Sequence, residues 1–163
     1  MISATSATLA ANVENLELTG SAAANAIGNT ANNVLTGNAG VNVIRGGLGR
    51  DTMTGGAGRD TFDFDVATHS VTGAATRDII TDFQHLADRI DVSTIDASTK
   101  YSGNNTFTLL TKSGALFTGK GAELRFTSGS TTVIEGDVNG DKRADFQIAL
   151  SDYVALSASD FVL

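Results

Sequence analysis

Large apolar residues recur about every nine positions through the first third of this 163-residue chain. They are Leu35, Ile44, Met53 and Phe62, and Leu18 and Ile27 continue the period upstream with one residue deleted before Leu35. Mostly polar residues flank each of them, which is typical of a very short strand with one side chain facing a core. Such a strand buries too little apolar surface to be stable alone, so the pattern predicts strands that stack on their neighbours.

A turn sequence that begins with glycine precedes the strands at Leu35, Ile44, Met53 and Phe62. Residues 46–54 read GGLGRDTMT and residues 55–63 read GGAGRDTFD, and both fit GGxGxDxUx, where U is a large apolar residue. Upstream, residues 28–36 and 37–45 keep the same frame, with Asn in place of the Asp. Glycine adopts positive φ without a Cβ clash, which suits a tight turn whose carbonyls bend inward. Each unit therefore predicts a turn and a short strand, and two units would form one coil of a flattened parallel helix.

In such a helix, equivalent side chains recur on one flank every 18 residues. Asn33 is then expected beside Asp51, and Asn42 beside Asp60. Asp78 lies 18 residues after Asp60, so we expect it one coil further along the same flank.

The repeat units resemble the RTX nonapeptide repeats of calcium-binding β-rolls. The resemblance implies that the Asp of each turn and the turn carbonyls hold Ca²⁺ between adjacent turns, and Ca²⁺ prefers six to eight such oxygen ligands. Carried over by position, the ligands are Asp51 and Asp60 with the carbonyls of Gly46, Gly47, Leu48, Gly49, Gly55, Gly56, Ala57 and Gly58, and Asp78 would close the last site. Asn33 and Asn42 offer an uncharged oxygen, so their turns should bind Ca²⁺ more weakly or not at all. A glycine-rich solenoid without metal is the alternative, although its stacked acidic turns would repel one another.

The segment after the repeats changes character. Phe62, Phe64 and Val66 alternate as in a strand, and an irregular loop follows. Residues 81–90 have apolar residues at helical spacing and a capping box, which predict a short helical turn before a strand at 89–93. Asp82 and Asp88 lie in this segment and either assist the last calcium site or serve as caps and solvated charges.

From residue 101 onward, Gly, Ser and Asn turns separate segments that predict antiparallel strands: NTFTLLT, GALFTG (114–119), AELRFTS, TTVIEGD and ADFQIAL. The predicted fold is all-β, a parallel β-roll followed by an antiparallel β-sandwich, with the roll at 1–66 and the sandwich at 67–163. Within the second part, residues 137–145 (DVNGDKRAD) place acidic and amide side chains at alternating positions. This is the beginning of an EF-hand-like loop without its Gly or its final Glu, and a polar hairpin turn is the alternative.

The order of several segments extends the resemblance to the C-terminal domain of serralysin-type secreted metalloproteases. The segments are ENLELTG, the GN and GG turns, DIITDF, DRIDVS and FTGKGAELRF. Similar segments occur in the repeat modules of secreted alginate epimerases. In such type I secretion substrates, an acidic residue followed by apolar residues at the C-terminus, here SASDFVL, belongs to the export signal; docking of a final strand is the compatible structural explanation.

Composition narrows the possible functions. A formal charge of −7 argues against a nucleic-acid partner and suits cation binding, and no apolar run is long enough to span a membrane. The chain has no cysteine and no recognisable metalloprotease or hydrolase motif, so we do not expect it to be an enzyme.

The resemblance therefore implies a non-catalytic, extracellular Ca²⁺-binding module that folds on calcium and directs type I secretion. Its expected partners are an upstream catalytic or passenger domain and the type I secretion machinery. The alternative is a carbohydrate-binding or adhesive module with an alginate-like polysaccharide as partner. Lys112, Lys120 and Arg125 would suit a polyuronate, whereas the aromatics Tyr101 and Tyr153 are isolated.

Overall fold

The computed structural model describes residues 1–100 and 102–163, so Tyr101 lies outside the described part of the chain. Short strands dominate this part, and two single turns of 3₁₀ helix accompany them. The strands are β1 (Ile2–Ser3), β2 (Ala7–Thr8), β3 (Asn15–Leu18), β4 (Ala24–Ile27), β5 (Val34–Thr36), β6 (Asn42–Arg45), β7 (Thr52–Thr54), β8 (Thr61–Asp63), β9 (Asp78–Ile80), β10 (Arg89–Asp91), β11 (Thr108–Leu110), β12 (Glu123–Ser128), β13 (Thr132–Asp137), β14 (Phe146–Leu150) and β15 (Phe161–Val162). The 3₁₀ turns are η1 (Ala67–His69) and η2 (Ala158–Asp160).

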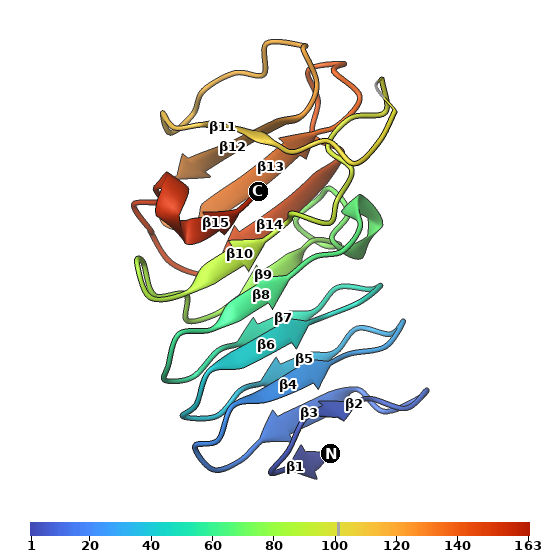
Figure 1. The fold of residues 1–163 in the computed structure, drawn as a ribbon, viewed down its shortest axis with the longest axis vertical. Helices are drawn as coiled ribbons and strands as arrows, with labels where there is room; N and C mark the ends of the chain where they lie inside the picture. Colours follow the sequence, from blue (N-terminus) through green and yellow to red (C-terminus); the bar gives the residue numbers. More distant parts are fainter. Residues whose placement is uncertain (101) are drawn as a thin grey trace.

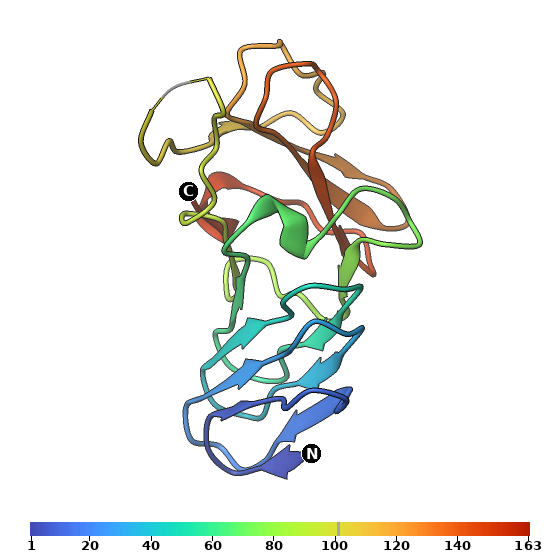
Figure 2. The ribbon, with the colours of Figure 1, turned by 90° about the vertical axis from the view of Figure 1, so that its right-hand side faces the viewer.

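Successive strands of the first half alternate between two parallel sheets, which confirms the predicted β-roll. One sheet has the order β1-β3-β5-β7-β9 before it continues into β14-β13-β12-β11, and the other has the order β15-β10-β8-β6-β4-β2. Figures 1 and 2 show the coils stacked along the long axis, from the N-terminus at one end to β11–β14 at the other. Each coil therefore contributes one strand to each sheet.

The core of the roll consists of two ladders of inward-facing side chains, one per sheet. In the first sheet, Leu16 pairs with Leu35 and Leu35 with Met53; in the second, Ala26 pairs with Ile44 and Ile44 with Phe62. All six are at most 1% exposed, so each short strand buries its side chain only because the next coil covers it.

Of the two core positions predicted upstream of Leu35, Leu18 is buried, at 3% exposed, whereas the prediction for Ile27 was wrong. Ala26, and not Ile27, occupies the inward position of β4. Ile27 is the last residue of this strand and pairs with Arg45. The interval from Ala26 to Leu35 is nine residues, so no residue is deleted there. The large side chain of Ile27 suggested the wrong frame, because the inward position of this coil holds an alanine.

The loop at residues 64–77 interrupts the regular coil. Thr52 of β7 pairs with Ile79 of β9, 27 residues later, and Thr61 of β8 pairs with Arg89 of β10, 28 residues later. A regular coil would need 18 residues, so this coil carries an insertion that leaves the strand ladder intact. In the strand predicted here, Phe62 and Phe64 are buried but Val66 is exposed.

Residues 81–90 form a single turn rather than a helix. Asp88 N–H donates to Gln84 O at 2.9 Å, which closes the turn, but Leu86 has a φ of 66° and cannot continue a right-handed helix. Thr81 does not cap this turn, because its hydroxyl hydrogen-bonds Thr54 across the sheet. The strand predicted to follow is β10, which ends at Asp91.

The second half extends the first sheet with longer strands. β12, β13 and β14 pair antiparallel as predicted, and β14 joins β9 in parallel, so this sheet is continuous with the roll. Two expectations were wrong: β11 and β12 are parallel, and residues 114–119 form no strand. In the second sheet, β15 pairs in parallel with β10, so the C-terminus docks against the last coil of the roll.

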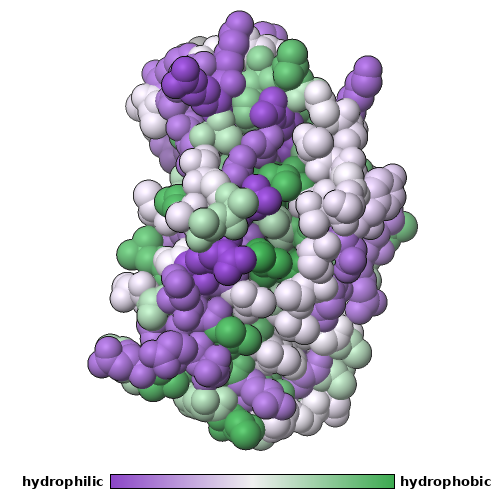
Figure 3. All heavy atoms as spheres, turned by 180° about the vertical axis from the view of Figure 1, so that it is seen from behind, coloured by the Kyte–Doolittle hydropathy of each residue, from purple (hydrophilic) through white to green (hydrophobic). Residues whose placement is uncertain are grey.

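The predicted boundary between residues 66 and 67 falls within the interrupted coil. The ladders β7–β9 and β8–β10 join strands on its two sides, and the division into two domains stays a prediction. In the described residues, no helix is long and apolar enough to cross a membrane. Figure 3 shows the opposite face from Figure 1, where hydrophobic residues form small separate groups between polar ones.

Candidate metal site in the turns of the roll

Glycine at fixed positions lets each turn fold tightly against its own acidic side chain. A Cβ on Gly46 would overlap Asp51 Oδ2, and a Cβ on Gly55 would lie 2.6 Å from Asp60 Oδ2. The second and fourth residues of both turns require positive φ; they are Gly47 (100°), Gly49 (113°), Gly56 (92°) and Gly58 (131°). The sequence GGxG therefore brings the carboxylate back over the backbone of its own turn.

On one side of the roll, three residues form a ladder that we call the first flank: Asn33, Asp51 and Asp78. Asn33 N–H donates to Asp51 Oδ1 at 2.7 Å, and Asp51 N–H donates to Asp78 Oδ1 at 2.7 Å. Each carboxylate thus accepts one backbone hydrogen bond from the preceding turn. The predicted neighbourhood of Asn33 and Asp51 is confirmed.

The other side carries the second flank, Asn42, Asp60 and Asp88. Asn42 N–H donates to Asp60 Oδ1 at 2.8 Å, which confirms their predicted neighbourhood, and Asp60 N–H donates to Asp88 Oδ1 at 2.9 Å. Asp82, in the next coil, caps the turn that carries Asp60: its two oxygens accept the N–H groups of Gly55 and Gly56, each at 2.8 Å.

The predicted place of Asp78 was wrong. Asp78 follows Asp51 and not Asp60, because the loop at 64–77 adds nine residues to this coil, so that residue 78 takes the place on the first flank that residue 69 would have in a regular coil. Asp88, which the sequence offered only as an assisting residue or a cap, takes the corresponding place beside Asp60. The frame of the repeat alone gave no signal for this exchange.

Three buried carboxylates each have one oxygen without a hydrogen-bond partner. We call them the unpaired carboxylates: Asp51, Asp60 and Asp78, each through Oδ2. They are at most 1% exposed. A buried, unpartnered carboxylate oxygen costs considerable free energy, and native proteins usually satisfy such a group with a hydrogen bond or a cation.

Burial changes the acidity of the same three groups. Desolvation raises the pKa of Asp51 and of Asp60 to about 6, although in each case a backbone hydrogen bond opposes the shift. Desolvation raises the pKa of Asp78 to about 8, and the charge of Asp51 adds to this shift. Without a cation, ionising the three together is therefore unfavourable, and a bound cation would reverse that preference.

The residues present fit a hard cation whose ligands are mostly backbone oxygens. In residues 1–100 and 102–163, no group of three or more acidic or histidine side chains is placed to hold a metal by itself. The turns supply further oxygens, since the carbonyls of Gly46 and Gly55 lie against Gly28 and Gly37 of the preceding coil. One or two carboxylates surrounded by carbonyls is a ligand set that suits Ca²⁺.

The loop at residues 137–145 is a polar hairpin turn between β13 and β14. Asp137 accepts the N–H groups of Gly140 and Lys142, and Asp145 accepts that of Val138 and the amide of Asn139. These carboxylates stabilise the turn through hydrogen bonds, so the loop gives no support to a second metal site.

Asp160 holds the C-terminal segment to the last coil. It is fully buried, and its oxygens accept the N–H groups of Ser157 at 2.6 Å and Leu86 at 3.0 Å and contact His85 Nδ1 at 3.0 Å. Sequence reasoning missed this contact, because residues 75 positions apart meet only in the folded chain.

Nine-residue repeats with glycine turns and one acidic or amide side chain per turn define this chain as a β-roll module. The family model of the peptidase M10 serralysin C terminal matches residues 9–163, and the chain belongs to that family.

Comparison with solved structures supports the same fold. The chain is similar to the solution structure of the AlgE6R3 subunit of the Azotobacter vinelandii mannuronan C5-epimerase, with 27% identity and a TM-score of 0.62 over 97% of this chain and 82% of the other. The AlgE6R2 subunit of the same enzyme has the same fold, at 24% identity and a TM-score of 0.58 over 99% and 91% of the two chains. Comparison with curated proteins gave no match.

Proposed function

We propose that this chain is a non-catalytic module that folds on binding Ca²⁺ and serves the secretion and extracellular folding of an attached protein. The attached part would be an upstream catalytic or passenger domain, such as a metalloprotease. The observation that carries the proposal is the set of three unpaired carboxylates buried in the roll, two of them in glycine turns and Asp78 in the next coil of the first flank. Membership of the serralysin C-terminal family supports the secreted, extracellular location.

The ligands would be the unpaired carboxylates and the carbonyls of Gly46, Gly47, Leu48, Gly49, Gly55, Gly56, Ala57 and Gly58. Bound Ca²⁺ would supply the positive charge that offsets the burial of these carboxylates. The chain's own residues already hold the carboxylates in place through backbone hydrogen bonds between successive coils. Because these groups are assembled only in the folded chain, Ca²⁺ would stabilise that state by mass action.

Far-UV circular dichroism and calorimetry would test calcium-dependent folding. We expect the chain in chelator to lack part of its β signal and to regain it in millimolar Ca²⁺, with heat of binding in a calorimetric titration. An unchanged spectrum without heat of binding would reject the proposal.

We propose further that the C-terminal segment belongs to the type I export signal. The buried contacts of Asp160 and the pairing of β15 with β10 support a segment that is available before folding and covered after it. Fusions that carry the intact chain should reach the medium through a type I secretion machinery, and removal of residues 160–163 should impair their export. Equal secretion of the two fusions would contradict this role.

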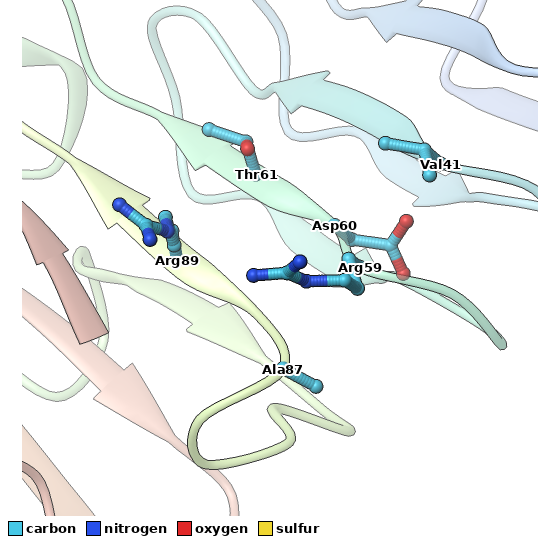
Figure 4. Close-up of a pocket in the computed structure, with 6 residues that line it drawn as sticks. All are labelled: Val41, Arg59, Asp60, Thr61, Ala87 and Arg89. Carbon is cyan, nitrogen blue, oxygen red and sulfur yellow. The ribbon is translucent and has the colours of Figure 1, made fainter. Parts of the chain in front are cut away.

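A second candidate function is binding of an acidic polysaccharide. A hollow of about 280 Å³ near Asp60 is lined by Arg59 and Arg89, and Figure 4 shows Arg59 extending toward Arg89 while the Asp60 carboxylate points away. Neither arginine forms an ion pair with a described residue.

This hollow is a better candidate for polyuronate binding than Arg125, one of the basic residues named from the sequence. Arg125 is already paired with Glu135 at 2.8 Å and lies over the Phe117 ring at 4.1 Å. Titration with alginate oligomers should give saturable binding that Arg59→Ala with Arg89→Ala abolishes. Binding that this double variant leaves unchanged, or no binding by the native chain, would reject the second function.

A further inference from the structure

The turns that carry Asn in place of Asp contain a second asparagine four residues earlier. In the turn at residues 37–42, Asn42 Oδ1 accepts the Asn38 N–H at 2.8 Å. Asn42 Nδ2 donates to Asn38 Oδ1 at 3.1 Å and to Ala24 O at 2.9 Å. The side chain that corresponds to Asp60 is thus fully hydrogen-bonded, and its amide nitrogen faces two oxygens.

The turn at residues 28–33 repeats this arrangement. Asn33 Oδ1 accepts the Asn29 N–H at 2.7 Å, and Asn33 Nδ2 donates to Asn29 Oδ1 at 3.2 Å. Two turns with the same pair of residues therefore have the same internal hydrogen bonds.

The first asparagine of each pair also bonds to the coil before it. Asn29 Nδ2 donates to Ala10 O at 2.8 Å and Val13 O at 2.9 Å. Asn38 Nδ2 donates to Thr19 O at 3.1 Å and Ala22 O at 3.0 Å. Amide donors therefore satisfy carbonyl oxygens between successive turns in this part of the roll.

The turns with Asp have no such donors. Gly47 and Gly56 stand where Asn29 and Asn38 stand one coil earlier, so neither turn has a side-chain amide at this position. Asp51 Oδ2 and Asp60 Oδ2 are left without a partner. The two kinds of turn are therefore alternative solutions for the same buried oxygens, one that uses amide donors and one that needs an external positive charge.

We infer that the asparagine pairs Asn29/Asn33 and Asn38/Asn42 exclude Ca²⁺ and replace it with hydrogen bonds. They divide the roll into a calcium-independent part, which we call the asparagine coils (residues 24–45), and a calcium-requiring part from residue 46 to 91. This inference rests on the proposed function only for the second part. The asparagine coils hold a folded edge on which the calcium-requiring coils assemble when Ca²⁺ is present.

Amide hydrogen exchange of the full chain in chelator tests the division. We expect β4 and β6 to exchange about 100-fold more slowly than β9 and β10 without Ca²⁺, and all four strands to be protected in millimolar Ca²⁺. Equally fast exchange of all four in chelator, with protection restored by Ca²⁺, would overturn the inference and leave the proposed function standing. Equal protection of all four with and without Ca²⁺ would overturn both.

Asn42→Asp tests the role of the amide donors. The substitution turns a donor that faces Ala24 O and Asn38 Oδ1 into a carboxylate oxygen. We expect β4 and β6 to lose their protection in chelator and to regain it in Ca²⁺, because the turn now has the acidic residue of the calcium-requiring turns.

Asn32→Asp is the matched control. Asn32 is exposed and uses only its Oδ1, which accepts the Arg50 N–H at 2.8 Å and is kept in the variant. It should behave as the native chain. If Asn42→Asp stays protected in chelator, or if Asn32→Asp loses protection equally, the amide donors of Asn42 are not the cause and the inference is overturned. The native chain decides the division even if Asn42→Asp does not fold.

Discussion

Asp78→Asn should change the stability of the chain in opposite directions with and without Ca²⁺. Asp78 is fully buried, Oδ1 accepts the Asp51 N–H, and Oδ2 has no partner. Asparagine keeps the oxygen that accepts this hydrogen bond and removes the charge. The variant therefore separates the burial of a negative charge from the packing of the turn.

The gain in chelator follows from the pKa of Asp78, which burial raises from 3.8 to about 8. In the unfolded chain this group is ionised at pH 7, about three pH units above its ordinary pKa. Protonating this one carboxylate on folding therefore costs about 4 kcal/mol. The new amide nitrogen has no hydrogen-bond acceptor of its own, and this unpaired donor offsets about 1–3 kcal/mol of the stabilisation. In chelator, folding of the calcium-requiring part, which contains Asp78, should therefore become more favourable by about 1–3 kcal/mol.

The loss in Ca²⁺ follows from the missing anionic ligand. Calcium affinity depends strongly on the number of charged ligands, and we expect about 100-fold weaker binding at this site, or about 2.7 kcal/mol. Urea unfolding at pH 7 in chelator and in millimolar Ca²⁺, with a calorimetric calcium titration, measures both effects.

The control for this experiment is Asp152→Asn, which makes the same change of charge at an exposed position. It should alter stability by less than about 0.5 kcal/mol under both conditions. If Asp78→Asn binds Ca²⁺ like the native chain and is no more stable in chelator, then Asp78 is neither a ligand nor a buried charge that needs one.

Three further predictions concern the turns and the C-terminus. Gly37→Ala should destabilise the chain by about 3 kcal/mol, or roughly 10 °C in Tm, because its Cβ would overlap the Gly55 carbonyl. Gly129→Ala is the control and should be tolerated, because its Cβ would meet only the Thr131 carbonyl oxygen, at 3.7 Å. Equal Tm values for the two variants would refute this prediction. In chelator, the free energy of unfolding should fall as pH rises from about 4 to about 8, because burial raises the pKa values of the unpaired carboxylates in the folded chain; a stability that rises over this range would contradict it. Asp160→Ala should lower the free energy of unfolding in urea by about 2–4 kcal/mol, because it leaves two N–H groups unpaired. Burial alone would raise the pKa of Asp160, but hydrogen bonds lower it, so the stabilisation by this carboxylate should disappear only as the pH falls below about 4. An effect of the substitution that persists at pH 2 would indicate lost packing instead.

The repeat made the first half of the fold predictable. A nine-residue period with glycine turns determines which side chains face inward, and the pairs Asn33–Asp51 and Asn42–Asp60 follow from it directly. The inward position of Ala26 was not predicted, because a small residue does not stand out in a pattern of large apolar residues, whereas the neighbouring Ile27 does.

The end of the candidate site was not predictable from the frame. The place of Asp78 depends on the length of the loop at 64–77, and nothing in the period shows how many residues that loop inserts into the coil. Contacts such as that of His85 with Asp160 depend on how the C-terminal segment returns to β10, which local pattern does not determine. The unpaired state of the carboxylate oxygens was not predictable either, because it depends on which neighbours in the folded chain carry hydrogen-bond donors.

A crystal structure of the full chain grown in millimolar Ca²⁺ would show directly whether the unpaired carboxylates hold the cation. We predict calcium density at about 2.3–2.6 Å from Oδ2 of the unpaired carboxylates, and none beside the amides of Asn33 and Asn42. Turns that stay metal-free at Asp51, Asp60 and Asp78, with the chain folded as before, would contradict it.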